Sequence, residues 1–173
     1  PDGMSYEAAA VAEPLAVGVH AANLASLEIG DTVAIFGCGP IGLCTLHSAR
    51  LAGASRIFAV DPIPERLQAA CKLGAHQVFE CRISDPVAGI MEMTDGRGVD
   101  VAFEAAGEQA AVDGAIAVAR IGGKALIIGI PAGERLSFDA HGARRKELAI
   151  INVRRSNFTL ERAIHIPFDI GPY

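Results

Sequence analysis

Short apolar runs alternate with longer, helically spaced segments along most of the chain. Six of these runs are rich in Val, Ile, Ala and Phe and carry few charges, which is typical of strands covered on both faces. The predicted strands lie at 32–36, 56–60, 77–80, 99–104, 124–130 and 147–153, with a brief extra strand at 136–139. Because strands and helices alternate, we predict an α/β fold with a doubly wound, six-stranded parallel sheet in the order 3-2-1-4-5-6.

An Ala-rich helical segment precedes the first predicted strand. Its helical spacing covers residues 7–22, Ser5 is placed to cap it, and Pro14 predicts a kink or a new helix start within it. A sheet domain that begins at the first strand has no need of this helix. We therefore divide the chain into a helical segment, a sheet domain and a tail that is irregular or a truncated helix, at 1–25, 26–160 and 161–173.

A glycine-rich turn joins the first predicted strand to the helix that follows it. Gly37 permits the tight turn, Gly39 lets the backbone approach a pyrophosphate closely, and Gly42 lets the helix pack on the strand. The helix begins at Pro40 and Ile41, where unpaired N–H groups and the positive end of the helix dipole favour a phosphate. The turn therefore predicts a site for a phosphate-bearing cofactor.

Asp61 makes this prediction more specific. It follows the second predicted strand and lies 61 − 42 = 19 residues beyond Gly42, near the ~20 residues at which an acid reaches a ribose diol in dinucleotide-binding domains. A carboxylate repels the 2′-phosphate of NADP, so the sequence favours NAD. Arg66, close behind, either flanks the adenosine or is a solvated helix residue. The alternative for the whole pattern is a glycine turn with a helix-capping Asp.

Composition and charge narrow the class of protein. Hydrophobic residues make up 51% of the 173 residues and aromatic residues only 5%, as expected for an aliphatic core between helices and a sheet. The formal net charge is −5, and the basic clusters at 144–146 and 154–155 are short, which argues against a nucleic-acid partner. We see no leader segment and no apolar run long enough to span a bilayer, so we expect no membrane partner and a cytoplasmic protein.

The cysteines and histidines form no recognisable metal-binding pattern. The cysteines are scattered without a C-x-x-C spacing, so we expect buried, reduced side chains. The histidines have no acid or serine at an informative spacing, and we expect them to be structural or solvent-facing. The residues concerned are Cys38, Cys44, Cys71, Cys81, His20, His47, His76, His141 and His165.

Four segments, spread over nearly the whole chain, carry a family resemblance. They read AEPLAVGVHA at 12–21, GCGPIGL at 37–43, FEAAG at 103–107 and NVRRSN at 152–157. With them the chain resembles the zinc-dependent medium-chain alcohol dehydrogenases, among them the sorbitol and other polyol dehydrogenases. The resemblance implies a Rossmann domain joined to a catalytic domain whose Cys and Gly-His-Glu sequence bind zinc. Those ligands are missing from this chain, so we expect a cofactor-binding half that is inert by itself.

The resemblance also implies roles for individual residues. Glu13 matches an acid at the zinc site of the polyol enzymes, as a ligand or through metal-bound water, and is otherwise a helix-surface acid. Arg155 matches an arginine that contacts polyol hydroxyls, with Arg154 as the alternative register. The floor beneath the nicotinamide is implied at Gly107, Gly129 and Ile130.

The implied reaction is reversible hydride transfer between a secondary alcohol or polyol and NAD, with zinc as the Lewis acid. A homo-oligomer is implied through the sheet edge at 136–139, since an unpaired edge strand can pair with a second copy. Two other interpretations stay open. One is an S-adenosylmethionine-dependent methyltransferase, whose last strands form an antiparallel hairpin, and the other is a non-catalytic module that senses NAD.

Overall fold

The computed structural model describes residues 4–168. Its strands are β1 (Thr32–Phe36), β2 (Arg56–Asp61), β3 (Gln77–Glu80), β4 (Val99–Glu104), β5 (Ala119–Ile127) and β6 (Ala149–Asn152). Its helices are α1 (Tyr6–Ala25), α2 (Pro40–Leu51), α3 (Pro64–Leu73), α4 (Pro86–Met93), α5 (Gln109–Val118), α6 (Ala140–Arg145) and α7 (Leu160–Ala163).

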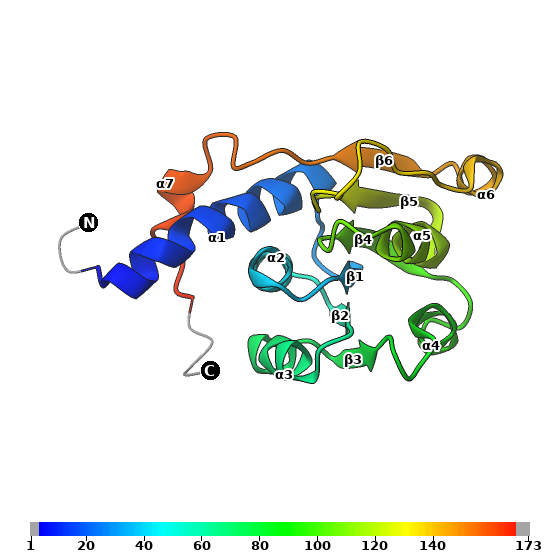
Figure 1. Ribbon diagram of the computed structural model, residues 1–173, viewed down its shortest axis with the longest axis horizontal. Coiled ribbons are helices and arrows are strands. Elements are labelled where there is room, and N and C mark those ends of the chain that lie inside the picture. The colour runs from blue at the N-terminus through cyan, green and yellow to red at the C-terminus, as the bar shows by residue number, and fades with distance from the viewer. Residues whose placement is uncertain (1–3, 169–173) are drawn as a thin grey trace.

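All six strands run parallel in one sheet, in the order β3-β2-β1-β4-β5-β6 (Figure 1). The predicted fold class and strand order are therefore confirmed. The last pair, β5 and β6, is parallel, which excludes the antiparallel hairpin expected of a methyltransferase. The sheet ends on one side at β3 and on the other at β6.

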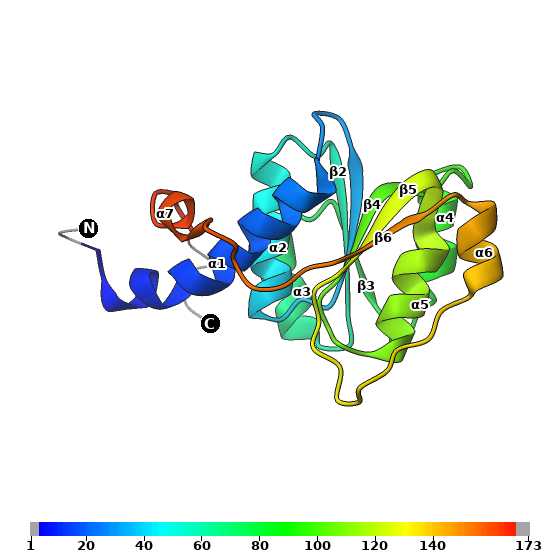
Figure 2. The same cartoon turned by 90° about the horizontal axis from the view of Figure 1, so that it is seen from above.

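Helices cover both faces of the sheet. Figure 2 shows α1, α2 and α3 on one face and α4, α5 and α6 on the other. Along β1 the side chains alternate between the two cores, because Val33 and Ile35 belong to one cluster and Ala34 and Phe36 to the other. A strand buried on both faces reads as a continuous apolar run, which explains why the sequence pattern located it.

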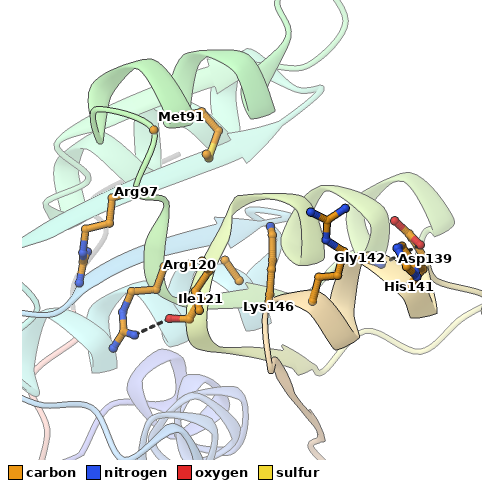
Figure 3. A pocket seen from close by; sticks show the side chains of 11 residues that line it. Met91, Arg97, Arg120, Ile121, Asp139, His141, Gly142 and Lys146 are labelled. Atoms are coloured by element: carbon orange, nitrogen blue, oxygen red, sulfur yellow. Dashed lines mark hydrogen bonds between the residues drawn. The ribbon is translucent and has the colours of Figure 1, made fainter.

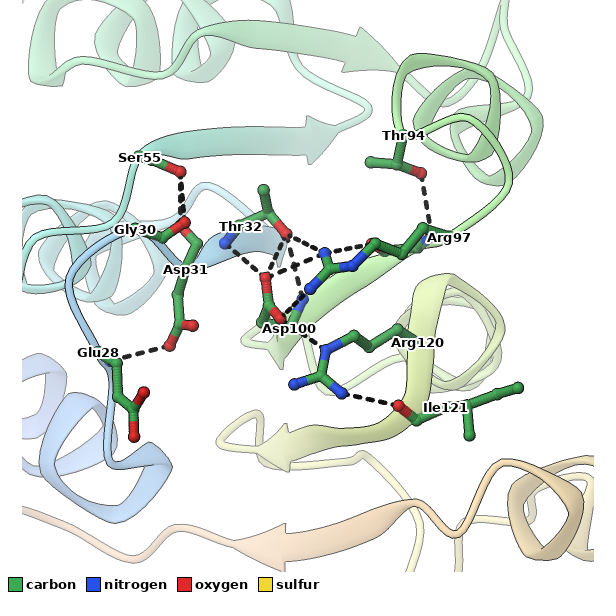
Figure 4. A network of polar contacts seen from close by, with 11 residues as sticks. Glu28, Gly30, Asp31, Thr32, Ser55, Thr94, Arg97, Asp100, Arg120 and Ile121 are labelled. Carbon is green, nitrogen blue, oxygen red and sulfur yellow. Dashed lines mark hydrogen bonds and ion pairs between the residues drawn. The ribbon is translucent and has the colours of Figure 1, made fainter.

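A polar network fastens the amino ends of the central strands (Figure 4). Asp100, at the start of β4, accepts hydrogen bonds from Thr32 N and Oγ1 at 2.9 and 2.7 Å. It also pairs with Arg97 Nη2 at 2.5 Å and Arg120 Nε at 2.6 Å. Burial raises the pKa of Asp100, but the hydrogen bonds from Arg97 and Thr32 outweigh burial and hold that pKa well below its usual value.

Helix α1 is longer and more regular than the sequence predicts. Ser5 caps it as expected, through a hydrogen bond from Ala8 N to Oγ, but the helix continues through Pro14 instead of restarting there. Packing of the following turns on α2 outweighs the lost hydrogen bond: a Cβ on Gly18 would lie 2.6 Å from Cys44 O. By length and composition α1 could cross a membrane, contrary to expectation, although 56% of its most apolar window is buried inside the fold.

The segment after β5 also differs from the prediction. Residues 136–139 form no strand, because the side-chain amide of Gln109 binds both backbone groups of Ser137, donating to its O at 2.7 Å and accepting from its N at 3.0 Å. On this side the sheet ends at β6 instead. β5 itself begins at Ala119, with Gly122 and Gly123 inside it, and ends at Ile127.

Two smaller expectations concern the cysteines and the tail. Cys38 and Cys44 are buried as expected, but Cys71 and Cys81 are exposed. The tail at 161–173 contains most of the short helix α7, and its last five residues lie outside the described part of the chain. The proposed division into three segments stays a prediction.

Candidate functional site

The glycine turn lies at the carboxyl end of β1, where its backbone leaves no space for side chains at two positions. Gly37 has φ +97°, and its N–H donates to Val60 O at 2.8 Å. A Cβ on Gly42 would lie 1.8 Å from Gly37 O, whereas a Cβ on Gly39 would meet nothing within 4 Å. Gly37 and Gly42 are therefore required by the fold, whereas the fold leaves open space for a side chain at Gly39.

Helix α2 starts at this turn without a side-chain cap. Gly39 is the N-cap residue and Pro40 follows in the first turn, so no side chain accepts a hydrogen bond from the first N–H groups. Such groups, together with the helix dipole, form a favourable environment for an anion. Pro40 and Ile41 therefore stand where the sequence places them, at the end of the helix that faces the turn.

Asp61, at the end of β2, is bonded to the glycine turn. Its side chain is 2% exposed, and its Oδ2 accepts a hydrogen bond from Cys38 N at 2.7 Å while Oδ1 accepts one from Ile63 N at 2.9 Å. Arg66 Nη1 lies 3.7 Å from Oδ2. A carboxylate offers about four acceptor positions, so roughly two remain for an incoming diol.

A hollow of about 870 Å³ opens at the carboxyl ends of the strands, and residues of several helices and strands line it. It contains Gly37, Gly39, Asp61 and Arg66 of the predicted cofactor residues. Pro40, Ile41, Gly42, Gly107, Gly129 and Ile130 are not among its lining residues. The hollow thus brings together the turn and the acid, the two features that the sequence joins by spacing.

The predicted nicotinamide floor is a contact between two backbone segments that follow β4 and β5. A Cβ on Gly107 would lie 2.4 Å from Ile130 O, and a Cβ on Gly129 would lie 2.1 Å from Gly107 N. The side chain of Ile130 is 91% exposed. Sequence reasoning missed Glu104 here: this buried acid accepts hydrogen bonds from the N–H groups of Ala106 and Gly107 at 2.8 and 2.6 Å.

Glu13 and Arg155 lie on neighbouring segments, both exposed. Glu13 is on α1, and Arg155, with φ +54°, is in the loop after β6. Thr159 ties that loop to α1 by donating a hydrogen bond from Oγ1 to Ala16 O at 2.6 Å. Among residues 4–168, no three His, Cys, Asp or Glu side chains are grouped so that they could hold a metal ion.

The thiol of the cysteine inside the turn is held in its protonated form. Burial, and then the charge of Asp61, raises the pKa of the Cys38 thiol to about 12. The histidines that the described contacts place are structural: His76 Nδ1 accepts a hydrogen bond from Ile57 N at 3.0 Å, and His47 Nε2 bonds Pro167 O at 2.8 Å. Neither residue lines the hollow at the turn.

A second hollow, of about 840 Å³, lies at the opposite, amino end of the sheet (Figure 3). Four cationic side chains line it, but three of them bind the protein itself. Arg97 and Arg120 pair with Asp100, and Lys146 Nζ donates to Ile116 O and to the neighbouring carbonyl at the end of α5. These three charges therefore stabilise the amino ends of the strands and the carboxyl end of α5.

The fold and the turn define a Rossmann-type domain, and comparison with known proteins gives its family. The family model described as zinc-binding dehydrogenase matches residues 40–166. Sorbitol dehydrogenase of Bacillus subtilis is 40% identical over 164 residues, which are 95% of this chain and 46% of that protein. The chain belongs to the zinc-binding dehydrogenase family, and it spans about half the length of the curated relatives it matches.

Solved structures of dehydrogenases are similar to this chain over most of its length. The crystal structure of 2R,3R-butanediol dehydrogenase from Bacillus subtilis has a TM-score of 0.85 and 37% identity, and the match covers 95% of this chain and 47% of that one. A zinc-binding dehydrogenase from Sinorhizobium meliloti 1021, bound to NADP, has a TM-score of 0.88 and 31% identity and covers 95% of this chain and 49% of that one.

Proposed function

We propose that this chain is the NAD-binding half of a zinc-dependent alcohol or polyol dehydrogenase. The observation that carries the proposal is the partly satisfied carboxylate of Asp61, which is buried beside the glycine turn and lines the 870 Å³ hollow. Two backbone N–H groups fix its position, and its remaining acceptor positions suit the two hydroxyls of an adenosine ribose. Gly39, open to the outside, leaves room for the pyrophosphate.

The chain's own share of the reaction is to hold and orient the cofactor. Gly107, Gly129 and Ile130 form the floor beneath the nicotinamide, Arg66 flanks the adenosine, and Glu13 and Arg155 face the substrate side. When bound, NAD would supply the hydride acceptor for a secondary alcohol or polyol, and a zinc ion would supply the Lewis acid. The zinc ligands other than Glu13 belong to the remainder of the longer protein, so the chain alone is inactive.

Asp61 also determines the choice between NAD and NADP. A buried carboxylate that lines the hollow repels a 2′-phosphate. Arg66 does not offset this, because it already lies 3.7 Å from Asp61 and its charge is shared with that carboxylate. We therefore favour NAD, although a relative of similar fold is bound to NADP.

Calorimetric titration of the purified chain with NAD and NADP tests the proposal. We expect the chain to bind NAD at least about tenfold more tightly than NADP, and Asp61→Asn to lose most of this difference, since each tenfold factor is about 1.4 kcal/mol. Glu92→Gln, an exposed acid on α4, is the charge-matched control and keeps the wild-type preference. Equal binding of NAD and NADP by the wild-type chain would refute the assignment of Asp61.

The cysteines and the edge of the sheet bear on the compartment and the assembly of the longer protein. We propose a cytoplasmic enzyme, because the four cysteines are free and a reducing compartment keeps them so. A homo-oligomer that pairs through the open edge at β6 replaces the one predicted at 136–139, because the edge carries unpaired backbone groups.

A further inference from the structure

Glu104 is a fully buried acid at the carboxyl end of β4, and the proposed function gives it no role. Its Oε1 accepts hydrogen bonds from Ala106 N at 2.8 Å and Gly107 N at 2.6 Å. These bonds fix the turn that follows β4. A neutral glutamine could make both of them through its amide oxygen, so capping the turn does not explain why the residue is an acid.

The second oxygen of the same carboxylate lies beside the segment after β5. Within residues 4–168 no donor reaches Oε2, although the atom is buried. A Cβ built on Gly129 would lie 2.7 Å from it, so Oε2 faces the backbone of Gly129 directly. Glu104 therefore stands between the two segments that form the floor of the nicotinamide site.

No cation of the described chain compensates this acid. The ion pairs found among residues 4–168 involve Asp61 and Asp100, and none involves Glu104. A buried carboxylate without a cationic partner is unfavourable for folding, because the two backbone hydrogen bonds to Oε1 replace only part of its hydration. A positive charge that arrives with a ligand removes part of that cost.

We propose that Glu104 is a specificity-determining residue that favours the oxidised over the reduced cofactor. This inference rests on the proposed function, which places Gly107, Gly129 and Ile130 beneath the nicotinamide. The nicotinamide ring of NAD⁺ is positively charged and that of NADH is neutral. A carboxylate buried behind the floor attracts only the charged ring, so it shifts the balance toward the form that accepts hydride from an alcohol.

The test is to measure the dissociation constants of NAD⁺ and NADH separately, by calorimetry, for the wild-type chain and for Glu104→Gln. The glutamine keeps the shape and the two hydrogen bonds of the turn but removes the charge. We expect the ratio of the NAD⁺ constant to the NADH constant to rise about tenfold, the size of a Coulomb interaction between partly buried unit charges. Glu92→Gln, which removes an exposed charge on α4, leaves the ratio unchanged.

Glu104→Asp separates charge from shape. The shorter acid keeps the charge but reaches the turn poorly, so both constants worsen while their ratio stays within about twofold of the wild-type value. Thermal unfolding shows which variants are folded, and Glu104→Asp keeps the inference testable if Glu104→Gln does not fold. A ratio unchanged in Glu104→Gln, or moved tenfold in Glu104→Asp, overturns the inference. Failure of the wild-type chain to bind either cofactor overturns the proposed function instead.

Discussion

At the residue scale, substitutions of Gly42 and Gly39 distinguish the folding of the turn from the binding of a ligand to it. Gly42→Ala would place a Cβ 1.8 Å from Gly37 O, a backbone atom that cannot move without opening the turn. We expect the free energy of unfolding to fall by about 3 kcal/mol or more, as for other clashes in a packed interior. Urea unfolding of the variant measures this loss.

Gly39→Ala is the matched variant. Gly39 has φ −69°, which any residue adopts, and its Cβ would meet no atom within 4 Å. We expect stability within about 0.5 kcal/mol of wild type but NAD binding weakened about tenfold or more, since the new methyl group stands where the pyrophosphate approaches. Wild-type NAD affinity in Gly39→Ala would show that no phosphate lies against this turn.

Spacing in the sequence was enough to predict that the glycine turn and Asp61 lie together, because a turn of fixed length joins elements that are adjacent in space. Their role in binding a cofactor stays a prediction. Spacing could not show that Asp61 binds the N–H of Cys38, 23 residues away in the chain, which consumes part of the carboxylate's capacity. Glu104 was equally hidden. Its significance lies in the second carboxylate oxygen, which has no donor among residues 4–168 and faces Gly129, and both features depend on how β4 and β5 are paired.

At the scale of elements, Asp100 joins the starts of β1, β4 and β5. Asp100→Asn removes the negative charge that holds two guanidinium groups, and the side chain it replaces is only 10% exposed. We expect the free energy of unfolding at neutral pH to fall by about 2–4 kcal/mol. Chemical denaturation measures the loss, and Glu92→Gln again serves as the control for net charge.

The same residue sets a dependence on pH. Because the pKa of Asp100 is lower in the folded chain than in the unfolded one, its contribution is complete above the unfolded value of about 3.9 and is lost as the pH falls through the folded value. The wild-type chain should therefore lose more stability than Asp100→Asn between about pH 5 and pH 2. Parallel acid-unfolding curves for the two chains would contradict this.

Strands could be predicted where the chain is buried on both faces. The prediction of a strand failed where one side chain takes the place of a neighbouring strand. The mostly apolar runs located β1, β2 and β4 within a residue or so, since such runs are typical of a covered parallel sheet. Residues 136–139 also alternate apolar and polar side chains, but the Gln109 amide satisfies Ser137 in place of a neighbouring strand. The sequence pattern of residues 136–139 does not indicate this contact between Gln109 and Ser137.

At the scale of the whole molecule, the amino and carboxyl ends of the strands have different roles. The amino ends are fixed by the Asp100 network, whereas the carboxyl ends gather Gly37, Asp61, Glu104 and Gly129 from four separate stretches of the chain. A ligand that bridges these four segments would add contacts between them beyond the hydrogen bonds of Asp61 and Glu104. Binding should therefore stabilise the entire fold and not only the turn.

Thermal unfolding with and without cofactor checks this. NAD at about 100 times its dissociation constant adds about 2.7 kcal/mol to the free energy of unfolding, which corresponds to a rise of roughly 5–10 °C in Tm for a chain of this size. NADP and S-adenosylmethionine at the same concentration should give smaller rises, and Asp61→Asn should lose most of the shift with NAD. The unfolding transition should stay single, because the bound cofactor spans segments on both sides of β1. A Tm that does not change at any concentration of NAD would count against the proposed function, because a cofactor that binds only the folded chain must raise its Tm.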